Sequence, residues 1–589
     1  MCRTITTTDN KTIKHPSISI QSNNTQVKKN TARNSPYDFR QQQRLFRAYD
    51  IRGDYQYFTD EFVYYLAQTF AQLFAKHCAK QVVIGYDVRY GSLDIAHQLA
   101  SALQQQNIEV LWLGLVTTPI MAYWAEQYSG HGLMVTASHS AKDVHGIKWL
   151  VAGESPSSAD IQALYQQLLQ LAQQDTLTKY PTLNSAKALK ASPNNPNNNE
   201  IATRYITRID NALKTINQPY NPTNNVDNTT SEKLPIRVVL DCLNGATSLY
   251  AQQLFEQFCQ QVICLNDYPD GTFPLGNPDP AEENRLQQLQ QAIIQHDADI
   301  GLAFDGDGDR LMVVDNTGRL IAPDHLLYLL AQVAIFESKH TKQFANSKQI
   351  PEVIFDVKCS HHLPKLITGL KAQPTMSRTG SSLMRKALQT GGSHAIFAGE
   401  LSGHFLFNDG FFVLHDDAMY AGLRLLNWLT RKSQQSKQSL ADIVDELPTM
   451  VSTADIYLPL PPSSTIQLSS PKQTKSTNNT NTKDHPLLIQ LRQLCQQLCN
   501  SASSKSQQTD LSENILPKKT TLTCIDGIRL DFSHGFGIIR QSNTSHSFTV
   551  RFAGDTLDDL TKVQQYFVSL CHQFDPDFAK QIANICPTV

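Results

Sequence analysis

The chain has 589 residues, of which 41% are hydrophobic and 18% charged, and its 51 basic and 53 acidic side chains leave a net charge of −2. This balance argues against a polyanion-binding surface, so we expect no nucleic-acid partner and only local anion sites. At about 150 residues per domain, the length predicts roughly four domains. Eleven scattered cysteines without a CxxC pair indicate reduced thiols in a cytoplasmic protein, and no apolar run is long enough to cross a membrane.

The N-terminal residues 1–43 are rich in Thr, Asn, Gln, Ser and Lys and poor in apolar side chains. Such a segment buries too little surface to offset its loss of conformational entropy, so we predict a disordered tail. A transit peptide is the alternative because acidic residues are scarce, although no amphipathic arginine-rich face is present.

Strands and helices alternate after this tail. Apolar residues recur at helical spacing over 62–73 behind a capping Thr59, and a buried strand follows at 82–86. A helix behind Ser92 and a strand at 108–113 continue the series. This alternation predicts a parallel sheet with helices on both faces.

Two more series of the same kind begin near residues 236 and 353, and the last part of the chain differs from them. Short strands that follow one another closely, with a final helix at 557–570, predict an antiparallel sheet there. Asn-, Pro-, Ser- or Thr-rich stretches read as surface insertions at 187–200, 218–233, 465–484 and 500–519.

Three carboxylates follow a buried strand in the stretch DGDGDR, as Asp305, Asp307 and Asp309 with glycines between them. Glycine lets the backbone curl so that alternate carboxylates converge on one hard cation, and the open coordination positions suit a magnesium that binds phosphate. The rival is a calcium EF-hand, which needs glycine at its sixth position and glutamate at its twelfth. Counted from Asp305, those positions hold Arg310 and Asn316, so the rival is excluded.

Three other polar stretches are candidate site loops. Ser138 and His139 follow the strand at 132–135, where α/β folds place chemistry, although an ordinary strand-to-loop Ser-His reads the same. Glu400, Ser402 and His404 alternate, so in an extended segment they would face one side and grip sugar hydroxyls; an exposed edge is an equal alternative. Residues 540–544 make a phosphate clasp or a polar hairpin turn.

Together these stretches resemble the α-D-phosphohexomutase superfamily, and most closely its bacterial phosphomannomutase/phosphoglucomutase group. The matching motifs, in the family's order, are FRAYDIRG (46–53), TASH (136–139), DGDGDR (305–310), GELSGH (399–404) and RQSNT (540–544). The resemblance implies α/β architecture: three related α/β domains plus a C-terminal α+β domain around a central cleft. The implied boundaries are a tail at 1–43 and domains at 44–186, 187–318, 319–447 and 448–589.

The resemblance also implies an isomerase that interconverts hexose 1-phosphate and hexose 6-phosphate through a phosphoserine and a hexose 1,6-bisphosphate. It implies one Mg²⁺ per site, glucose 1,6-bisphosphate as activator, hexose phosphates of mannose and glucose as partners, and a monomer. The implied catalytic residues are Ser138, His139, Arg52, Lys148 and His404, and the implied metal ligands are Ser138, Asp305, Asp307 and Asp309. The implied substrate-binding residues are Tyr49, Arg310, His325, Lys358, Thr379, Gly380, Ser381, Glu400, Ser402, His404, Arg540, Ser542, Asn543, Thr544 and Arg551.

The sequence departs from the group's usual pattern at several of these loops. Ser140 replaces an asparagine, His325 an arginine, Ser381 a histidine thought to help proton transfer, and Ser545 a threonine. Serine cannot act as a general base near neutral pH as imidazole can, so His404 or Lys148 is expected to carry more of that role. A phosphoglucosamine mutase and a non-catalytic sugar-phosphate-binding homologue are the alternative functions.

Overall fold

The computed structural model describes residues 38–174, 195–217, 233–338, 349–462, 484–503, 516–542 and 547–587. The four predicted insertions fall mainly on ranges outside these residues, and so does the predicted tail up to residue 37. The end of the tail was predicted wrongly. Residues 38–43 are described, the 3₁₀ helix η1 (Arg40–Leu45) starts there, and Phe39 is buried in the first core, where its ring contacts Phe62 and Tyr65. One aromatic side chain is enough to anchor this short polar stretch.

The first sheet has the spatial order β1-β5-β4-β2-β3. Its strands are β1 (Ile51–Asp54), β5 (Val144–Leu150), β4 (Gly132–Val135), β2 (Gln81–Tyr86) and β3 (Glu109–Leu115). β2 runs parallel to β3 and β4, but β5 is antiparallel to both of its neighbours. The prediction of a parallel sheet is therefore wrong for the strand after β4, because the chain returns there through a short loop instead of a crossover helix.

Both faces of this sheet are covered, as the alternation of strands and helices predicts. Val82 and Ile84 of β2 belong to one core and Val83 to another, since successive side chains of a strand point to opposite faces. Thr59 caps α1 by accepting from the Phe62 amide, which confirms the predicted helix start. The helices of this part are α1 (Asp60–Lys76), α2 (Ser92–Gln105), α3 (Thr118–Glu126), α4 (Ser158–Gln174) and α5 (Asn198–Asn217), with η2 (Tyr55–Tyr57).

The second and third sheets repeat one topology, β7-β6-β8-β9 and β11-β10-β12-β13. In each, three strands are parallel and the fourth returns antiparallel after a short turn. The strands are β6 (Leu234–Asp241), β7 (Cys259–Leu265), β8 (Ile300–Phe304), β9 (Leu311–Asp315), β10 (Glu352–Asp356), β11 (Gln373–Ser377), β12 (Ala395–Gly399) and β13 (Phe405–Phe407). The same order, β3-β2-β4-β5, stands inside the first sheet, so three units share one plan.

Helices cover these two sheets and join them into one large apolar core. They are η4 (Ala246–Leu249), α6 (Ala251–Phe258), α7 (Gln287–His296), α8 (Pro323–Ser338), α10 (Leu363–Gly369), α11 (Ser381–Gly391), η5 (Gly392–His394), α12 (Ala418–Ser436) and α13 (Leu440–Asp445). α7 begins five residues after the predicted start at 282, because residues 277–286 form turns instead.

The fourth unit is the predicted antiparallel sheet, with the order β14-β19-β18-β17-β16 and with β15 also paired to β19. Its strands are β14 (Val451–Ser452), β15 (Ile456–Pro459), β16 (Thr521–Thr523), β17 (Ile528–Phe532), β18 (Gly535–Gln541) and β19 (Ser547–Gly554). Its helices are α14 (Pro486–Ser503), α15 (Leu557–His572) and α16 (Pro576–Ala583), of which α16 was not predicted.

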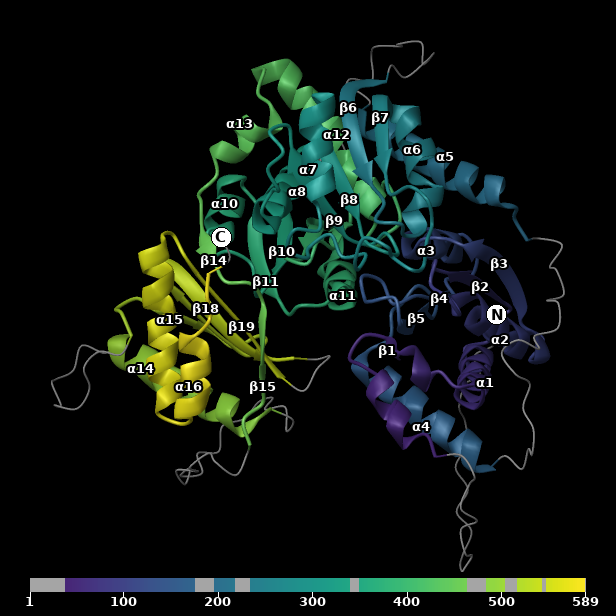
Figure 1. Cartoon of the computed structure of the whole chain (residues 1–589), viewed down its shortest axis with the longest axis horizontal. Helices are drawn as coiled ribbons and strands as arrows, with labels where there is room; N and C mark the ends of the chain where they lie inside the picture. Colours follow the sequence, from purple (N-terminus) through teal and green to yellow (C-terminus); the bar gives the residue numbers. More distant parts are fainter. Residues whose placement is uncertain are drawn as a thin grey trace, which may run out of the picture.

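Figure 1 shows the fourth unit at one side of the molecule and the first unit at the other, with the second and third between and above them. Three α/β units of related topology and one antiparallel sheet with its helices confirm the predicted fold class. In the described part of the chain, no helix is both long enough and apolar enough to cross a membrane.

Candidate active site

The serine loop, between β4 and β5, carries Ser138 in a left-handed backbone conformation with φ of 54°. Residues other than glycine rarely adopt this conformation, and such strain gathers at functional positions. The Ser138 amide donates to Thr136 Oγ1 at 2.9 Å, and Arg89 Nη2 donates to the Ser138 carbonyl oxygen at 2.6 Å. Both bonds hold the loop so that Ser138 Oγ donates to Asp305 Oδ2 at 2.6 Å.

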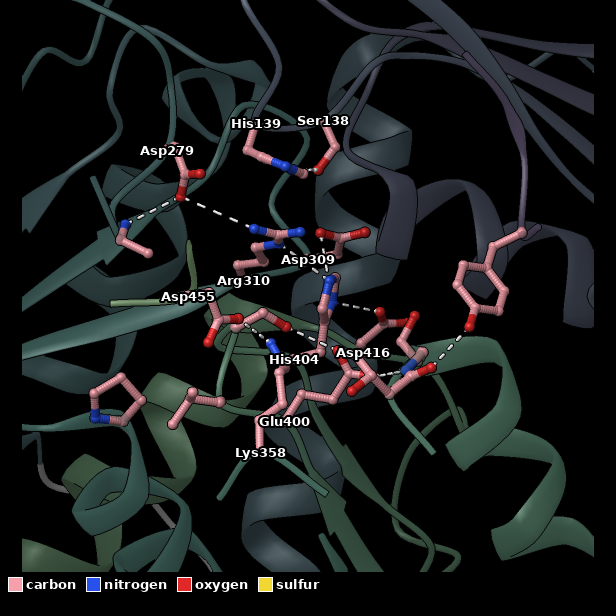
Figure 2. Close-up of a pocket in the computed structure, with 18 of the residues that line it drawn as sticks. Ser138, His139, Asp279, Asp309, Arg310, Lys358, Glu400, His404, Asp416 and Asp455 are labelled. Carbon is pink, nitrogen blue, oxygen red and sulfur yellow. Dashed lines mark hydrogen bonds and ion pairs between the residues drawn. The ribbon is translucent and has the colours of Figure 1, made fainter. Parts of the chain in front are cut away.

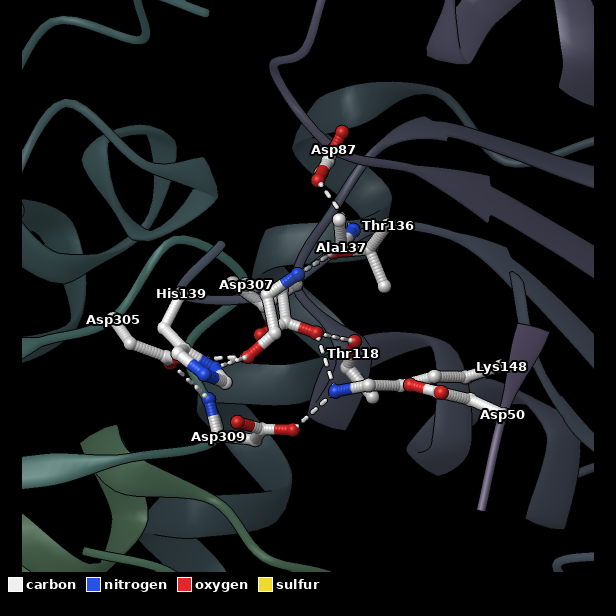
Figure 3. Close-up of polar contacts among 12 residues, drawn as sticks. Asp50, Asp87, Thr118, Thr136, Ala137, His139, Lys148, Asp305, Asp307 and Asp309 are labelled. Carbon is white, nitrogen blue, oxygen red and sulfur yellow. Dashed lines mark hydrogen bonds and ion pairs between the residues drawn. The ribbon is translucent and has the colours of Figure 1, made fainter. Parts of the chain in front are cut away.

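The metal loop, between β8 and β9, packs directly against the serine loop. Gly306 permits this approach, because a Cβ atom there would lie 2.6 Å from the Ser138 carbonyl oxygen. Behind the serine, Lys148 of β5 donates to Asp307 Oδ2 at 2.7 Å and to Asp309 Oδ2 at 2.5 Å (Figure 3). The three predicted carboxylates and the predicted lysine therefore meet at one point, where the first two units touch.

Two of these three buried carboxylates have pKa values that are shifted in opposite directions. Burial, and then the charges of Asp309 and Asp307, raise the pKa of Asp305 well above its usual value. For Asp307, the effect of burial is outweighed by Lys148, so its pKa is lowered. Asp307 Oδ1 and Asp309 Oδ1 are buried without a hydrogen-bond partner among the described residues. Converging, unpartnered oxygen donors fit a hard divalent cation.

Figure 2 shows two histidines in the cleft, His139 beside Ser138 and His404 near Arg310 and Asp309, and their pKa values are shifted in opposite directions. His139 Nδ1 lies 3.3 Å from Ser138 Oγ, and burial together with the charge of Arg310 holds the pKa of His139 well below its usual value. Burial also acts to lower the pKa of His404, but the negative charges of Asp309 and Asp416 outweigh this effect and raise the pKa to about 9. His139 is therefore a neutral base at neutral pH, and His404 Nε2 accepts from Arg310 Nε at 3.1 Å.

The sugar loop, between β12 and β13, is a turn and not the extended segment that the alternation predicted. The Glu400 amide donates to the His404 carbonyl oxygen at 2.9 Å, and Gly403 has a φ of 93°, which tightens the hairpin. Ser402 Oγ donates to Glu400 Oε2 at 2.8 Å. Glu400, Ser402 and His404 still face one cavity, because a tight turn also gathers its polar side chains on its open side.

The far end of the cavity lies between the third and fourth units. It is lined by cationic side chains that form ion pairs with carboxylates. Lys358 Nζ lies 2.6 Å from Asp455 Oδ2, and Arg540 Nε donates to Asp526 Oδ2 at 2.9 Å. Arg551, on β19, is 3.8 Å from Asp324 Oδ2 and 3.9 Å from Asp455 Oδ1.

One cleft of about 880 Å³ brings most of the predicted residues together. The predicted residues that line it are Tyr49, Arg52, Ser138, His139, Lys148, Asp309, Arg310, His325, Lys358, Thr379, Gly380, Ser381, Glu400, Ser402, His404, Arg540 and Arg551. Asp305 and Asp307 lie behind Ser138, outside the lining. Ser542 is described but does not line the cleft, and Asn543 and Thr544 lie outside the described residues.

Several predicted residues are already engaged with other protein groups. Tyr49 donates its hydroxyl to the Thr379 carbonyl oxygen at 2.8 Å, and His325 Nε2 lies 3.0 Å from the Pro448 carbonyl oxygen. Arg52 is paired with Asp50 at 2.5 Å and also donates to Ser140 Oγ at 3.3 Å.

Sequence reasoning missed the side chains that hold the predicted ones in place. Asp416 Oδ2 lies 2.8 Å from His404 Nδ1, Asp416 Oδ1 accepts from Arg385 Nη2 at 3.0 Å, and Thr118 Oγ1 donates to Asp307 Oδ2 at 2.5 Å. Asp455 was missed as well. Only Asp416 left a signal, since it stands in an acidic pair before an amphipathic helix; Thr118 and Asp455 lie in stretches without any motif.

The fold and this cleft define a four-unit α/β enzyme with a serine hydroxyl beside a carboxylate cluster. Family models of phosphoglucomutase/phosphomannomutase α/β/α domains I, II and III match residues 43–175, 214–318 and 322–451. The chain is 30% identical over 535 residues to the phosphomannomutase/phosphoglucomutase of Pseudomonas syringae pv. tomato, covering 90% of this chain and 96% of that protein. It is 29% identical over 525 residues to a phosphoglucomutase of Neisseria gonorrhoeae, covering 89% and 95%.

Among solved structures, a phosphoglucomutase/phosphomannomutase family protein of Burkholderia thailandensis aligns with a TM-score of 0.67 at 27% identity, over 92% of this chain and 99% of that one. The chain belongs to the phosphoglucomutase/phosphomannomutase family, within the α-D-phosphohexomutase superfamily. The resemblance drawn from five motifs is confirmed.

Proposed function

We propose that this chain is a phosphomannomutase/phosphoglucomutase, an isomerase that interconverts hexose 1-phosphates and hexose 6-phosphates of mannose and glucose. The observation that carries the proposal is the Ser138 hydroxyl, 2.6 Å from a buried aspartate and open to a cleft lined by cations. The names of the relatives of near-full length support the choice of sugars.

Ser138 carries a phosphoryl group in this scheme. The phosphorus–oxygen bond to Ser138 breaks as a new one forms to the free hydroxyl of the hexose phosphate, which gives the hexose 1,6-bisphosphate. The hydroxyl proton passes to a base, and transfer of the other phosphoryl group back to Ser138 completes the cycle. Positioning and positive charge around the transferred group supply most of the catalysis in such reactions.

The protein's cations and one imidazole are placed for these steps. Arg52, Lys148 and Arg310 face the transferred group, and Lys148 stays charged because Asp307 and Asp309 raise its pKa against the effect of burial. His139, neutral and 3.3 Å from Ser138 Oγ, is the group that can accept a proton. We assign proton transfer to it because Ser381 stands where the group usually has a histidine, and because His404 Nε2 is already engaged by Arg310 Nε at 3.1 Å.

Mg²⁺ is the ion we propose for the carboxylate cluster, held by Asp305, Asp307, Asp309 and the group on Ser138. When bound, it neutralises charge on the transferred phosphoryl oxygens. Glucose 1,6-bisphosphate is the proposed activator, since it would load Ser138.

The rest of the cleft positions the sugar and its second phosphate. Glu400, Ser402 and His404 grip the hydroxyls, while Lys358, Arg540 and Arg551 hold the distal phosphate. The other proposed contacts are Tyr49, His325, Thr379, Gly380, Ser381, Ser542, Asn543 and Thr544. We also propose the boundaries 44–186, 187–318, 319–447 and 448–589 for the four domains.

The test is an assay of the full chain with Mg²⁺, mannose 1-phosphate or glucose 1-phosphate, and a trace of glucose 1,6-bisphosphate. We expect the 6-phosphates to form. Ser138→Ala should lower kcat by at least about three orders of magnitude, because no other hydroxyl replaces a lost nucleophile. Ser569→Ala, which removes an exposed helix serine, is the matched control and should retain full activity.

Mass spectrometry separates the alternatives. A phosphate on Ser138 after treatment with the bisphosphate supports the mutase. Turnover of glucosamine 6-phosphate alone would favour a phosphoglucosamine mutase. Inert substrates and an unlabelled Ser138 would favour a binding homologue and contradict the proposal.

A further inference from the structure

The boundary between the third and fourth units carries a cluster that the proposed reaction does not use. His361 and His362, which lie just before α10, both turn toward Asp555, which directly follows β19. His361 Nε2 lies 3.0 Å and His362 Nε2 lies 2.9 Å from the same oxygen, Asp555 Oδ1. Two adjacent residues of one unit thus converge on a single atom of the other; Figure 1 shows α10 and α15 on the two sides of this boundary.

Hydrogen bonding does not account for this convergence. Neither nitrogen of His361, nor His362 Nε2, nor Asp555 Oδ1 has a hydrogen-bond partner of acceptable geometry among the described residues, and all four atoms are buried. The His361 side chain is only 9% exposed. Burial and the neighbouring His362 lower the pKa of His361 to about 4, so this imidazole is not a cation that pairs with Asp555 at neutral pH. Buried polar atoms without partners are costly unless something binds them.

The donor set is that of a transition-metal ion. Two imidazole nitrogens and one carboxylate oxygen suit Zn²⁺ and similar divalent ions, whereas Mg²⁺ prefers oxygen donors alone. Ligand atoms about 2.0–2.2 Å from a tetrahedral ion are about 3.3–3.6 Å apart. The observed separations of 2.9 and 3.0 Å need an adjustment of only a few tenths of an ångström. The His362 and Asp555 side chains are 22% and 38% exposed, so the cluster lies close to the surface.

The backbone around the cluster is held in place by a contact that crosses the same boundary. Arg529 of β17 donates Nη1 to the carbonyl oxygens of Val357 and Cys359, both at 2.6 Å. The Ser360 amide donates to Asp324 Oδ1 at 2.8 Å. The segment that presents the two histidines is therefore fixed against the fourth unit, as a site with little reorganisation on binding requires.

We propose that His361, His362 and Asp555 form a binding site for a Zn²⁺-like divalent cation, separate from the carboxylate cluster beside Ser138. The bound ion joins the segment after β10 to the end of β19. The first of these carries Lys358 and the second carries Arg551, so the ion fixes the two sides of the cleft's far end relative to each other.

Cobalt is the probe for the test, because its visible absorption reports nitrogen ligands. The full chain is stripped with a chelator and titrated with Co²⁺ in excess Mg²⁺, which occupies the carboxylate cluster. We expect one saturable absorbing Co²⁺ per chain, displaced by Zn²⁺. His361→Ala, His362→Gln and Asp555→Asn should each weaken this binding at least about 100-fold, since losing even an outer-shell partner costs about 10–100-fold.

Two controls decide where the ion binds. His394→Ala removes another His–carboxylate pair of the third unit, with His394 Nε2 3.5 Å from Glu352 Oε2, and should leave the signal unchanged. His404→Ala breaks the other His-containing cluster among the described residues, Asp309–His404–Asp416, and should also retain the signal. Far-UV circular dichroism verifies that each variant folds. If a boundary variant does not fold, the wild-type and His404→Ala titrations still test whether the ion binds outside the cluster that contains His404.

The proposal is overturned if the wild-type chain gives no saturable signal, if His404→Ala abolishes it, or if the folded boundary variants keep it. Binding is measured without substrate, so its failure leaves the proposed mutase activity untouched, and an inactive enzyme leaves the metal site untouched.

Discussion

The two ends of the cleft are both lined by ion pairs, but they are built in opposite ways. At the reaction end, two of the three carboxylates, Asp307 and Asp309, share Lys148, and each has one oxygen with no partner among the described residues. At the distal end, Lys358 and Arg540 each have a carboxylate of their own, Asp455 and Asp526. The first end keeps buried carboxylate oxygens that no donor satisfies among the described residues, and at the second end each of these two cations already has a carboxylate partner.

This difference predicts what each end does when ligands bind. The reaction end gains from any added cation, because burial and mutual repulsion destabilise its carboxylates. In the proposed reaction, a phosphate at the distal end would compete with the carboxylates already paired there, so part of the attraction would be offset by weakening an existing pair. Catalysis should therefore depend on the first end and substrate affinity on the second.

The largest effect is expected at the reaction end. Asp307→Asn removes one charge from the cluster, and we expect kcat to fall by about 10²–10³-fold, in line with the loss of one electrostatic contact in a buried site. The Mg²⁺ concentration for half-maximal rate should rise. Steady-state kinetics against Mg²⁺ measure both, with Asp210→Asn, at a half-buried helix position paired with Lys214, as control. A change in sugar affinity alone would contradict the comparison.

A smaller effect, on a different constant, is expected at the distal end. Arg540→Ala should raise KM for the hexose phosphate about 10–100-fold, because it removes a charge-assisted bond to phosphate, and it should leave kcat nearly unchanged. Arg492→Ala breaks a similar pair in the same unit, with Asp484 at 2.9 Å, and should change neither constant. If Arg540→Ala lowered kcat instead, the two ends would not divide the work as proposed.

The smallest effect tests the exchange of partners itself. Asp455→Asn frees Lys358 from its competing carboxylate, so KM should fall by about 2–5-fold, as for the loss of an ion pair worth at most about 1 kcal/mol. Isothermal titration with glucose 1-phosphate measures the affinity directly, and Asp484→Asn is the matched control. An increase in KM would mean that Asp455 orders the lysine for binding instead of competing with the phosphate.

Sequence reasoning predicted the parts of this molecule that local pattern determines. The strand at 82–86, the cap at Thr59 and the antiparallel fourth unit each follow from a few neighbouring residues, and all are confirmed. The resemblance, and not local pattern, implied that Ser138 and Asp305 belong to one site, and Ser138 Oγ lies 2.6 Å from Asp305 Oδ2.

The remaining features depend on distant residues. The antiparallel return of β5, β9 and β13 could not be read from alternation, because a hairpin strand and a parallel strand carry the same apolar pattern. Asp455 holds Lys358 across 97 positions of sequence, and a single aspartate in a loop gives no sign of such a partner. The turn at Glu400 was misjudged because alternating polar residues suit a strand and a tight hairpin equally.

The three hairpin connections have a final consequence. The loops that carry Ser138, Asp305 and Glu400 are tied at both ends to adjacent strands of the same sheet. A lid on long linkers can move over a large distance, but these short hairpin loops keep the nucleophile and the sugar contacts in fixed positions. In the proposed reaction, each phosphate of the bisphosphate must in turn lie next to Ser138, whose position is fixed. It follows that the bisphosphate itself must reorient: it leaves one set of contacts and binds again in the opposite orientation.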